Sequence, residues 1–118
     1  MAGLRFHSVM LGASDVERSV TFYIERLGFT LRGRFEQFAF LDAAGVTIVL
    51  SGNLARARPP GDASVEIVLG ADGVRAAFDT LRERGVTFTT EPHTVDGTNE
   101  VANFTDPDGH VFSLYGPP

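Results

Sequence analysis

The side chains that could do chemistry in this sequence are few and lie far apart. Glu66 falls within an apolar run, Ser64–Leu69, that has the pattern of a strand, so its carboxylate is the first candidate for binding or for general-base catalysis. His7, His93 and His110 are scattered, and no Ser-His-Asp arrangement for nucleophilic catalysis follows from their positions. The chain has no cysteine. Disulfides, thiolate metal sites and thiol nucleophiles are therefore excluded.

Two interpretations of Glu66 stay open at this point. In the functional one the carboxylate lines a cavity, where it binds a ligand cation or acts as a base if burial raises its pKa. In the structural one it forms an ion pair with an arginine, and the candidates are Arg5, Arg32 and Arg34.

The chain contains an internal repeat that must position these residues. Leu11–Val16 returns as Leu69–Val74, and each copy continues as a helical pattern that ends in a glycine, Gly28 in the first and Gly85 in the second. A single duplication therefore accounts for the whole chain, and equivalent positions of the two halves can be compared.

Each half predicts a strand, a helix and three further strands. In the first half Ser14 and Glu17 form a capping-box pattern at the helix start, and in the second half Asp72 is the expected N-cap. The segment Pro92–Asn99 is polar and is expected to be a mobile loop. The expected strands of the two halves cover residues 4–12, 29–35, 37–41 and 46–50, and then 64–69, 86–90, 100–104 and 110–115.

This order predicts an α+β fold of two tandem β-α-β-β-β modules that form curved mixed sheets with one helix each. We expect a single domain over residues 1–118, with module one at 4–51, a linker at 52–63 and module two at 64–116. One helix covers only one face of a four-stranded sheet, so the other face must meet the other half, a second subunit or a ligand.

The composition and net charge of the chain limit which kinds of ligand and partner it is expected to bind. Of the 118 residues, 43% are hydrophobic and 21% are charged, as in an ordinary soluble domain. The net charge of −5 argues against binding to nucleic acid, which depends on phosphate neutralisation, and mildly favours a cationic or neutral ligand. No apolar stretch is long enough to span a membrane and no signal-peptide pattern is present, so a cytoplasmic location is expected.

Several motifs in this order resemble the vicinal oxygen chelate superfamily, which includes glyoxalase, bleomycin-resistance proteins, fosfomycin-resistance enzymes and extradiol dioxygenases. They are the run Ser14–Tyr23, the helix end Leu27–Phe29 and the turn Asp106–Gly109, all within paired β-α-β-β-β modules. The resemblance covers essentially the whole chain. It implies two such modules completed in a homodimer, so we expect this chain to form a homodimer. It also implies a ligand cavity on the concave face of the sheets and, in many members, a divalent metal held by His, Glu or Gln.

The resemblance assigns four positions to metal ligands, and this sequence fills them poorly. They are Ser8, Val49 or Leu50, Glu66 and Ser113. His7 is one residue out of register, so strand alternation turns it away from the cavity, and we expect it to pack at a module or subunit boundary. One carboxylate with two hydroxyls is a weak set of donors for a transition metal. No metal and no other cofactor is therefore expected.

Aromatic residues complete the expected site. Strand alternation places Phe38 and Phe40 on one face, and Tyr115 shares the face of Ser113. These features favour non-metal binding of a small molecule, cationic or aromatic, in the manner of drug-sequestering bleomycin-resistance proteins. The alternative is a metal-dependent lyase, isomerase or dioxygenase, with Glu66 recruiting His7. The expected ligand-binding residues are Ser8, Phe38, Phe40, Leu50, Glu66, Ser113 and Tyr115.

Overall fold

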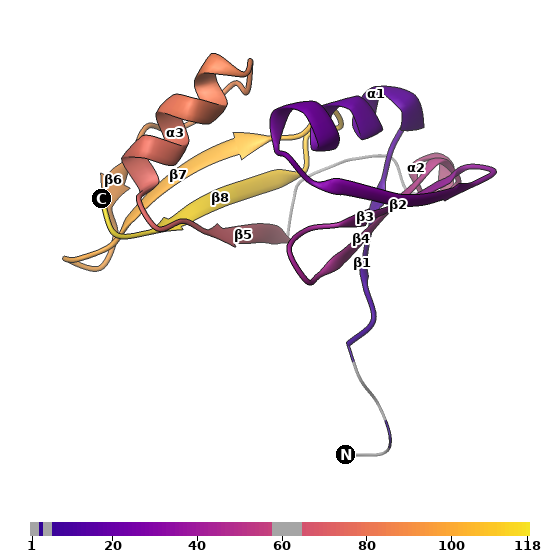
Figure 1. Cartoon of the computed structure of the whole chain (residues 1–118), viewed down its shortest axis with the longest axis horizontal. Helices are drawn as coiled ribbons and strands as arrows, with labels where there is room; N and C mark the ends of the chain where they lie inside the picture. Colours follow the sequence, from indigo (N-terminus) through magenta and orange to yellow (C-terminus); the bar gives the residue numbers. More distant parts are fainter. Residues whose placement is uncertain (1–2, 4–5, 58–64) are drawn as a thin grey trace.

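The computed structural model describes residues 3, 6–57 and 65–118, in which two similar halves follow one another (Figure 1). The first half contains β1 (Val9–Gly12), α1 (Val16–Thr21), the π-helical turn η1 (Phe22–Arg26), β2 (Thr30–Phe35), β3 (Phe38–Asp42), β4 (Thr47–Ser51) and α2 (Gly52–Ala57). The second half contains β5 (Glu66–Gly70), α3 (Val74–Glu83), β6 (His93–Thr94), β7 (Glu100–Thr105) and β8 (Val111–Gly116). None of the helices in these ranges is long and apolar enough to cross a bilayer.

Each half builds a four-stranded mixed sheet of the same topology. The strand order is β1-β4-β3-β2 in module one and β5-β8-β7-β6 in module two. In both sheets the first strand pairs in parallel with the last, and the other neighbours are antiparallel. The predicted α+β fold of two repeated modules is confirmed.

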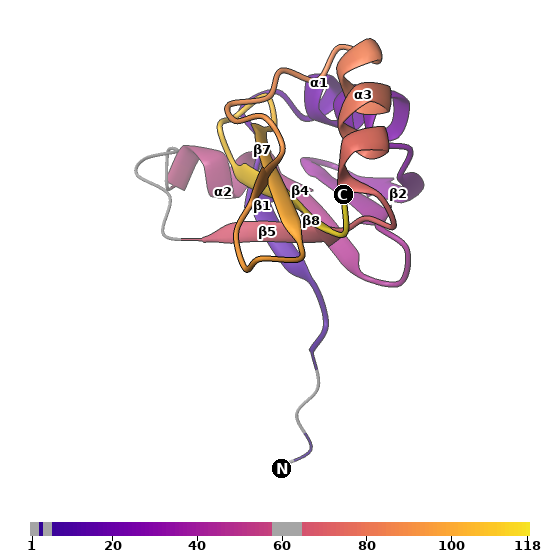
Figure 2. The ribbon, with the colours of Figure 1, turned by 90° about the vertical axis from the view of Figure 1, so that its left-hand side faces the viewer.

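The helices α1 and α3 lie on the same side of the two sheets (Figures 1 and 2). Strand alternation sends Leu11, Leu41 and Leu50 toward this side in module one, and all three are buried. We call the side of each sheet opposite α1 and α3 its open face; in module one α2 packs against the Gly12 end of this face. In module one it carries Met10, Phe35, Phe38, Phe40, Val49 and Ser51, and in module two Glu66, Val68, Asn103, Ser113 and Tyr115.

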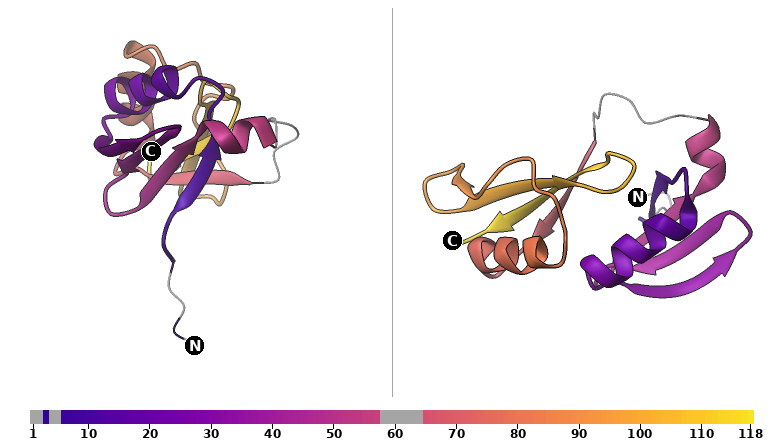
Figure 3. Two further views of the ribbon diagram at one scale, coloured as in Figure 1. Left: turned by 90° about the vertical axis from the view of Figure 1, so that its right-hand side faces the viewer. Right: turned by 90° about the horizontal axis from the view of Figure 1, so that it is seen from above.

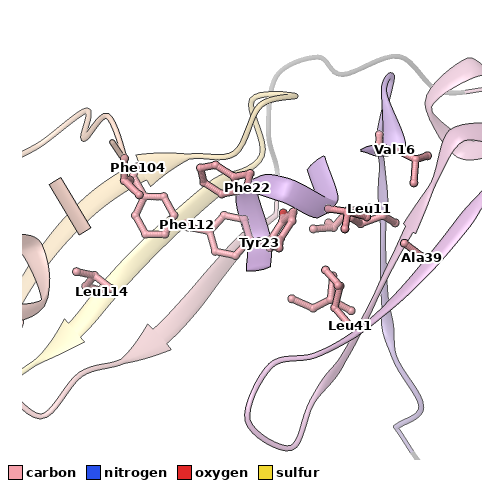
Figure 4. Close-up of a cluster of buried hydrophobic side chains, with 14 of the residues drawn as sticks. Leu11, Val16, Phe22, Tyr23, Ala39, Leu41, Phe104, Phe112 and Leu114 are labelled. Carbon is pink, nitrogen blue, oxygen red and sulfur yellow. The ribbon is translucent and has the colours of Figure 1, made fainter. Parts of the chain in front are cut away.

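The modules lie side by side and share one core (Figures 3 and 4). The fully buried ring of Tyr23, on η1, lies 6.0 Å from the ring of Phe112 on β8. Polar contacts join the same surfaces, because Asp108 of module two accepts hydrogen bonds from the backbone and the hydroxyl of Ser14, at 3.0 and 2.6 Å. The turn that resembles the superfamily motif therefore holds the two modules together.

The helix starts differ from prediction by one residue each. Asp15, and not Ser14, is the N-cap of α1, where its carboxylate accepts the backbone N–H of Arg18. Ser14 instead bonds to Asp108, a long-range contact that competes with the local cap. In module two Gly73 is the N-cap and makes no side-chain bond, so the prediction of Asp72 at that position was wrong. The glycine stops are as predicted, with φ of +78° at Gly28 and +93° at Gly85.

Two connecting segments contain structure that the sequence did not predict. The expected linker begins as α2, and its residues 58–63 lie outside the described ranges. The polar segment Pro92–Asn99 includes the short strand β6. Conversely, residues 86–90 form only one bridge, between Phe88 and Phe104, where a full strand was expected.

Candidate functional site

The open face of module one carries two stacked aromatic rings. Phe38 and Phe40 lie on β3, with Ala39 between them pointing to the helix side, and their ring centroids are 6.4 Å apart at 30°. Both rings are half-buried, so each keeps part of its face available. Such a pair offers an apolar platform on which a flat molecule can stack.

Leu50 does not belong to this face. It pairs with Leu11 and Ala39 on the helix side of the sheet and is completely buried in the core. The neighbouring Val49 pairs with Met10 and Phe40, so it is the member of the predicted Val49-or-Leu50 pair that faces the rings. Neighbouring residues of a strand point to opposite faces of the sheet. The prediction of Leu50 as a site residue was therefore wrong, and Val49 takes its place.

Ser8 and His7 lie together at the entrance to β1. The strand begins only at Val9, so strict alternation does not hold His7 away from Ser8. The His7 ring nitrogen Nδ1 lies 3.1 Å from the Ser8 hydroxyl, and the imidazole is exposed. The exposed His7 imidazole is therefore not packed between the described parts of the two modules.

On the open face of module two, polar side chains form a continuous row. Ser113 on β8 donates a 2.5 Å hydrogen bond to the Glu66 carboxylate on β5, and accepts one of 2.8 Å from the Asn103 amide on β7. The Thr90 hydroxyl donates to the side-chain oxygen Oδ1 of Asn103 at 2.9 Å. Ser113 is 1% exposed, whereas Glu66 is exposed. The buried hydroxyl of Ser113 therefore holds the Glu66 carboxylate in place while the carboxylate stays accessible to solvent.

The arginine partners considered for Glu66 have other contacts. Arg32 pairs with Asp42 at 2.8 Å, and Arg34 pairs with Glu17. Arg5 lies outside the described residues. The structural interpretation of Glu66 as a partner of Arg32 or Arg34 is therefore wrong, and its described partner is a neutral hydroxyl.

Tyr115 shares the open face of module two with Ser113, but its hydroxyl is already engaged. It donates to the Asp96 carboxylate at 2.8 Å and accepts from the Asn99 amide at 3.0 Å. The hydrogen bond from the Asn99 backbone, followed by that from Tyr115, holds the pKa of Asp96 far below its ordinary value. These contacts fix the 96–99 turn beside the open face, where the sequence predicted a mobile loop.

Each of the two remaining histidines has a ring nitrogen next to a backbone carbonyl oxygen. His93 is exposed on β6, and its Nδ1 lies 2.8 Å from the carbonyl oxygen of Glu91. His110 is half-buried, and its Nε2 lies 2.8 Å from the Gly12 carbonyl oxygen at the end of β1. His110 therefore joins module two to module one, away from both open faces.

The donors at the superfamily's metal positions do not fit a metal ion. Val49 is apolar, Ser8 offers a neutral hydroxyl, and the Ser113 hydroxyl donates a hydrogen bond to Glu66, the single carboxylate of the set. Neutral hydroxyls are weak ligands for transition metals. Across the described residues, no cluster of three or more His, Asp or Glu side chains is arranged to hold a metal.

Sequence reasoning missed Asn103 and Asp96, which position Ser113 and Tyr115. Asn103 lies on the same face as Ser113 by alternation along the expected strand 100–104, so its contact was within reach of the pattern. Asp96 lies in a loop whose turn depends on four hydrogen bonds that it accepts from Thr98 and Asn99, and no periodic signal marks it.

Comparison with known proteins agrees with this architecture. Residues 5–114 match the model of the Glyoxalase/Bleomycin resistance protein/Dioxygenase superfamily. The chain belongs to this superfamily. Its expected membership, inferred above from the paired modules and the Asp106–Gly109 turn, is thereby confirmed.

Three relatives illustrate the range of the superfamily around this chain. A probable lactoylglutathione lyase of Vibrio cholerae is 32% identical over 97% of this chain and 91% of its own length. Glutathione transferase FosA of Serratia marcescens is 32% identical over 89% of this chain and 75% of its own. The crystal structure of an antibiotic-binding protein from a Streptomyces species matches with a TM-score of 0.77 and 29% identity, over 97% and 98% of the two chains.

Proposed function

We propose that this protein binds a small molecule on its open faces without a metal ion. The observation that carries the proposal is the state of Glu66: it is the single carboxylate among the superfamily's metal positions, and it is held by the Ser113 hydroxyl at 2.5 Å. With Ser8 and Val49 at the other positions, the site has the groups to bind an organic molecule but not those to bind a cation such as Zn²⁺.

The two open faces suit different parts of one ligand. Phe38 and Phe40 offer stacked rings, and Glu66 offers a negative charge backed by a fixed hydrogen-bonded row. An aromatic ligand that carries a positive charge satisfies both, since aromatic surfaces and one well-placed charge are typical of small-molecule sites. The net charge of −5 favours the approach of such a cation.

A homodimer completes the site in this proposal. Several apolar side chains on the open faces are strongly exposed in the single chain. They include Met10 at 47%, Phe35 at 63% and Val68 at 57%. Exposed apolar side chains on the open faces of both sheets are surface that a partner can cover. We propose that the open faces of two copies cover one another and enclose the ligand between them.

Sequestration agrees with what one relative is named for. The Streptomyces protein is described as antibiotic-binding, and its match covers nearly all of both chains. One-to-one binding of a drug needs no catalytic group. The histidines of this chain, which are scattered and form no catalytic arrangement, are consistent with such binding. In this proposal the protein protects its host by holding a toxic aromatic compound.

A second candidate is a metal-dependent enzyme, and the relatives named lactoylglutathione lyase and glutathione transferase favour it. It would require Glu66 to recruit donors that the described chain does not bring to it, such as His7. Turnover of S-lactoylglutathione that depends on added Ni²⁺ or Zn²⁺ would favour this candidate over sequestration.

Calorimetric titration at pH 8 with a chelator present tests the binding proposal. The probes are proflavine, a planar aromatic cation, and acridine, its uncharged analogue. We expect Phe40→Ala to weaken both by roughly tenfold, because one stacking partner is lost. Glu66→Gln should weaken proflavine alone, by about three- to fivefold, as for a solvated ion pair.

Leu31→Ala, on the helix side of β2, is the control and should leave both affinities unchanged. Wild-type affinity for both probes in both variants would contradict the proposal. So would binding that disappears when the chelator is added.

A further inference from the structure

An apolar groove of about 730 Å³ runs between the two modules on their helix side. One wall comes from module one, with Val9, Ile48 and the β3–β4 turn around Ala44. The other wall is the length of α3 together with residues 67–70 of β5. We call this the intermodule groove. It lies on the opposite side of the sheets from Phe38, Phe40 and Glu66.

The groove exists because the shared core is incomplete here. The buried contact between modules is made by η1 and β8, around Tyr23 and Phe112. Farther along, most of the partly buried apolar side chains next to the core line the groove. They include Val9, Leu27, Phe29, Ile67, Leu69 and Leu81. Their exposed surface gains free energy when an apolar molecule covers it.

Small residues on α3 leave the space open. Ala76 and Ala77 face the groove, and they are followed one turn later by Thr80 and Leu81. From Gly73 to Leu81 the helix wall is about 12 Å long at 1.5 Å per residue. The volume lies within the range of sites that hold small molecules, roughly 300–1,000 Å³.

Charge indicates which kind of molecule fits. Asp72 is the charged side chain among the groove's lining residues, and it is exposed at the end where α3 begins. No described residue bonds to or pairs with its carboxylate. One end of the groove is therefore negative and the remainder apolar.

We propose that the intermodule groove is a second binding site, for an elongated apolar molecule with one basic end. The alkyl or aryl part lies along α3 against Ala76, Leu81 and Ile67, and the ammonium group lies at Asp72. This site is distinct from the ligand site on the open faces, because it uses neither Phe38, Phe40 nor Glu66; Val68 of β5 is a lining residue that also belongs to the open face.

A series of simple alkylamines tests the proposal by calorimetry on the full chain. We expect hexylammonium, heptylammonium and octylammonium to bind with affinities that rise roughly fourfold per added methylene. Asp72→Asn should weaken octylammonium by about three- to fivefold, as for a partly solvated ion pair, while leaving 1-octanol unchanged. The matched control is Asp79→Asn, which removes an exposed carboxylate of α3 outside the groove.

Ala76→Leu fills the groove from an exposed helix position where leucine is a good helix former, so folding should be retained. It should abolish saturable octylammonium binding, and Ala76→Ser should not. Octanoate that binds as tightly as octylammonium would overturn the proposal. So would octylammonium binding that Ala76→Leu leaves intact or that Phe40→Ala removes, because the latter result places the amine on the open faces.

Discussion

The hydroxyl of Tyr23 in module one donates a 2.7 Å hydrogen bond to the Asp106 carboxylate in module two. Both groups are buried, and Asp106 also accepts the backbone N–H groups of Asp108 and His110. Burial raises the pKa of Asp106, and the hydrogen bond from Tyr23 partly offsets this rise. The pair therefore joins the modules at a point where an unpaired group would be costly.

Removing the Tyr23 hydroxyl should destabilise the fold. Tyr23→Phe leaves a buried carboxylate with one donor fewer, and we expect a loss of about 1–3 kcal/mol in the free energy of unfolding. The variant also raises the Asp106 pKa further, so its stability should fall more than the wild type's as pH rises from about 4, because the folded state holds that proton more tightly. Urea titration at several pH values measures both effects.

The control for this prediction is Tyr115→Phe, in which the lost hydroxyl is exposed. It should cost clearly less stability than Tyr23→Phe. Equal losses would contradict the role given to the buried pair.

Asp108 should affect the pH dependence of stability in the sense opposite to Asp106, because its pKa is lowered and not raised. Burial alone would raise its pKa, but hydrogen bonds from Ser14 and Ser19, with Arg18 nearby, lower it below the ordinary 3.8. A lowered pKa in the folded state gives stability that is present above the ordinary value and is lost as pH falls through the folded one. Asp108→Asn should therefore be less stable at neutral pH, by about 1–3 kcal/mol, and flatter at acid pH.

Thermal unfolding of wild type and Asp108→Asn between about pH 2 and pH 6 shows this difference. Parallel curves for the two proteins would mean that the Asp108 carboxylate does not contribute to acid sensitivity.

A charge on the open face should dissociate the proposed homodimer. Val68 is 57% exposed on β5, and Val68→Glu places a carboxylate in the proposed interface. Analytical ultracentrifugation should show monomers for this variant and dimers for wild type. The matched control is Val46→Glu, which changes a similarly exposed valine, at 46%, on the helix side. A monomeric wild type, or a dimer that survives Val68→Glu, would contradict the proposed interface.

The neighbouring residues Ser14 and Asp15 at the start of α1 should stabilise the fold in different ways. Asp15→Ala removes the N-cap and should cost about 1 kcal/mol of unfolding free energy. Ser14→Ala instead removes a hydrogen bond to Asp108 between the modules. Because Ser14→Ala and Asp108→Asn remove the same contact, the double variant should lose less unfolding free energy than the sum of the two single losses. Denaturant titration of the single and double variants measures this coupling, and strict additivity would argue against the contact.

Much of the fold could be predicted because each module repeats one plan of strand, helix and three strands. Helix stops at Gly28 and Gly85 and the alternation around Phe38 and Phe40 are local properties of the chain. The N-caps were not predictable in the same way. Ser14 and Asp15 are both good caps, and what decides between them is Asp108, which lies far along the sequence.

The candidate site could be predicted only to the level of its face. The family resemblance gives Glu66 and Ser113, and alternation adds Tyr115 to the face of Ser113. The structure places all three on one open face. Leu50 was misplaced because apolar residues on β4 are buried on both faces, so burial gave no sign of the register there. The hydroxyl of Tyr115 is occupied by a loop aspartate that no pattern connects to it.

The central claim is that Glu66 holds a place in an organic ligand site and not in a metal site. Elemental analysis of the purified protein, before and after dialysis against a chelator, tests it most directly. We predict substoichiometric Mn, Fe, Ni and Zn in both samples, with no change in Glu66→Gln. A stoichiometric metal ion that the chelator removes and that Glu66→Gln fails to retain would contradict the account.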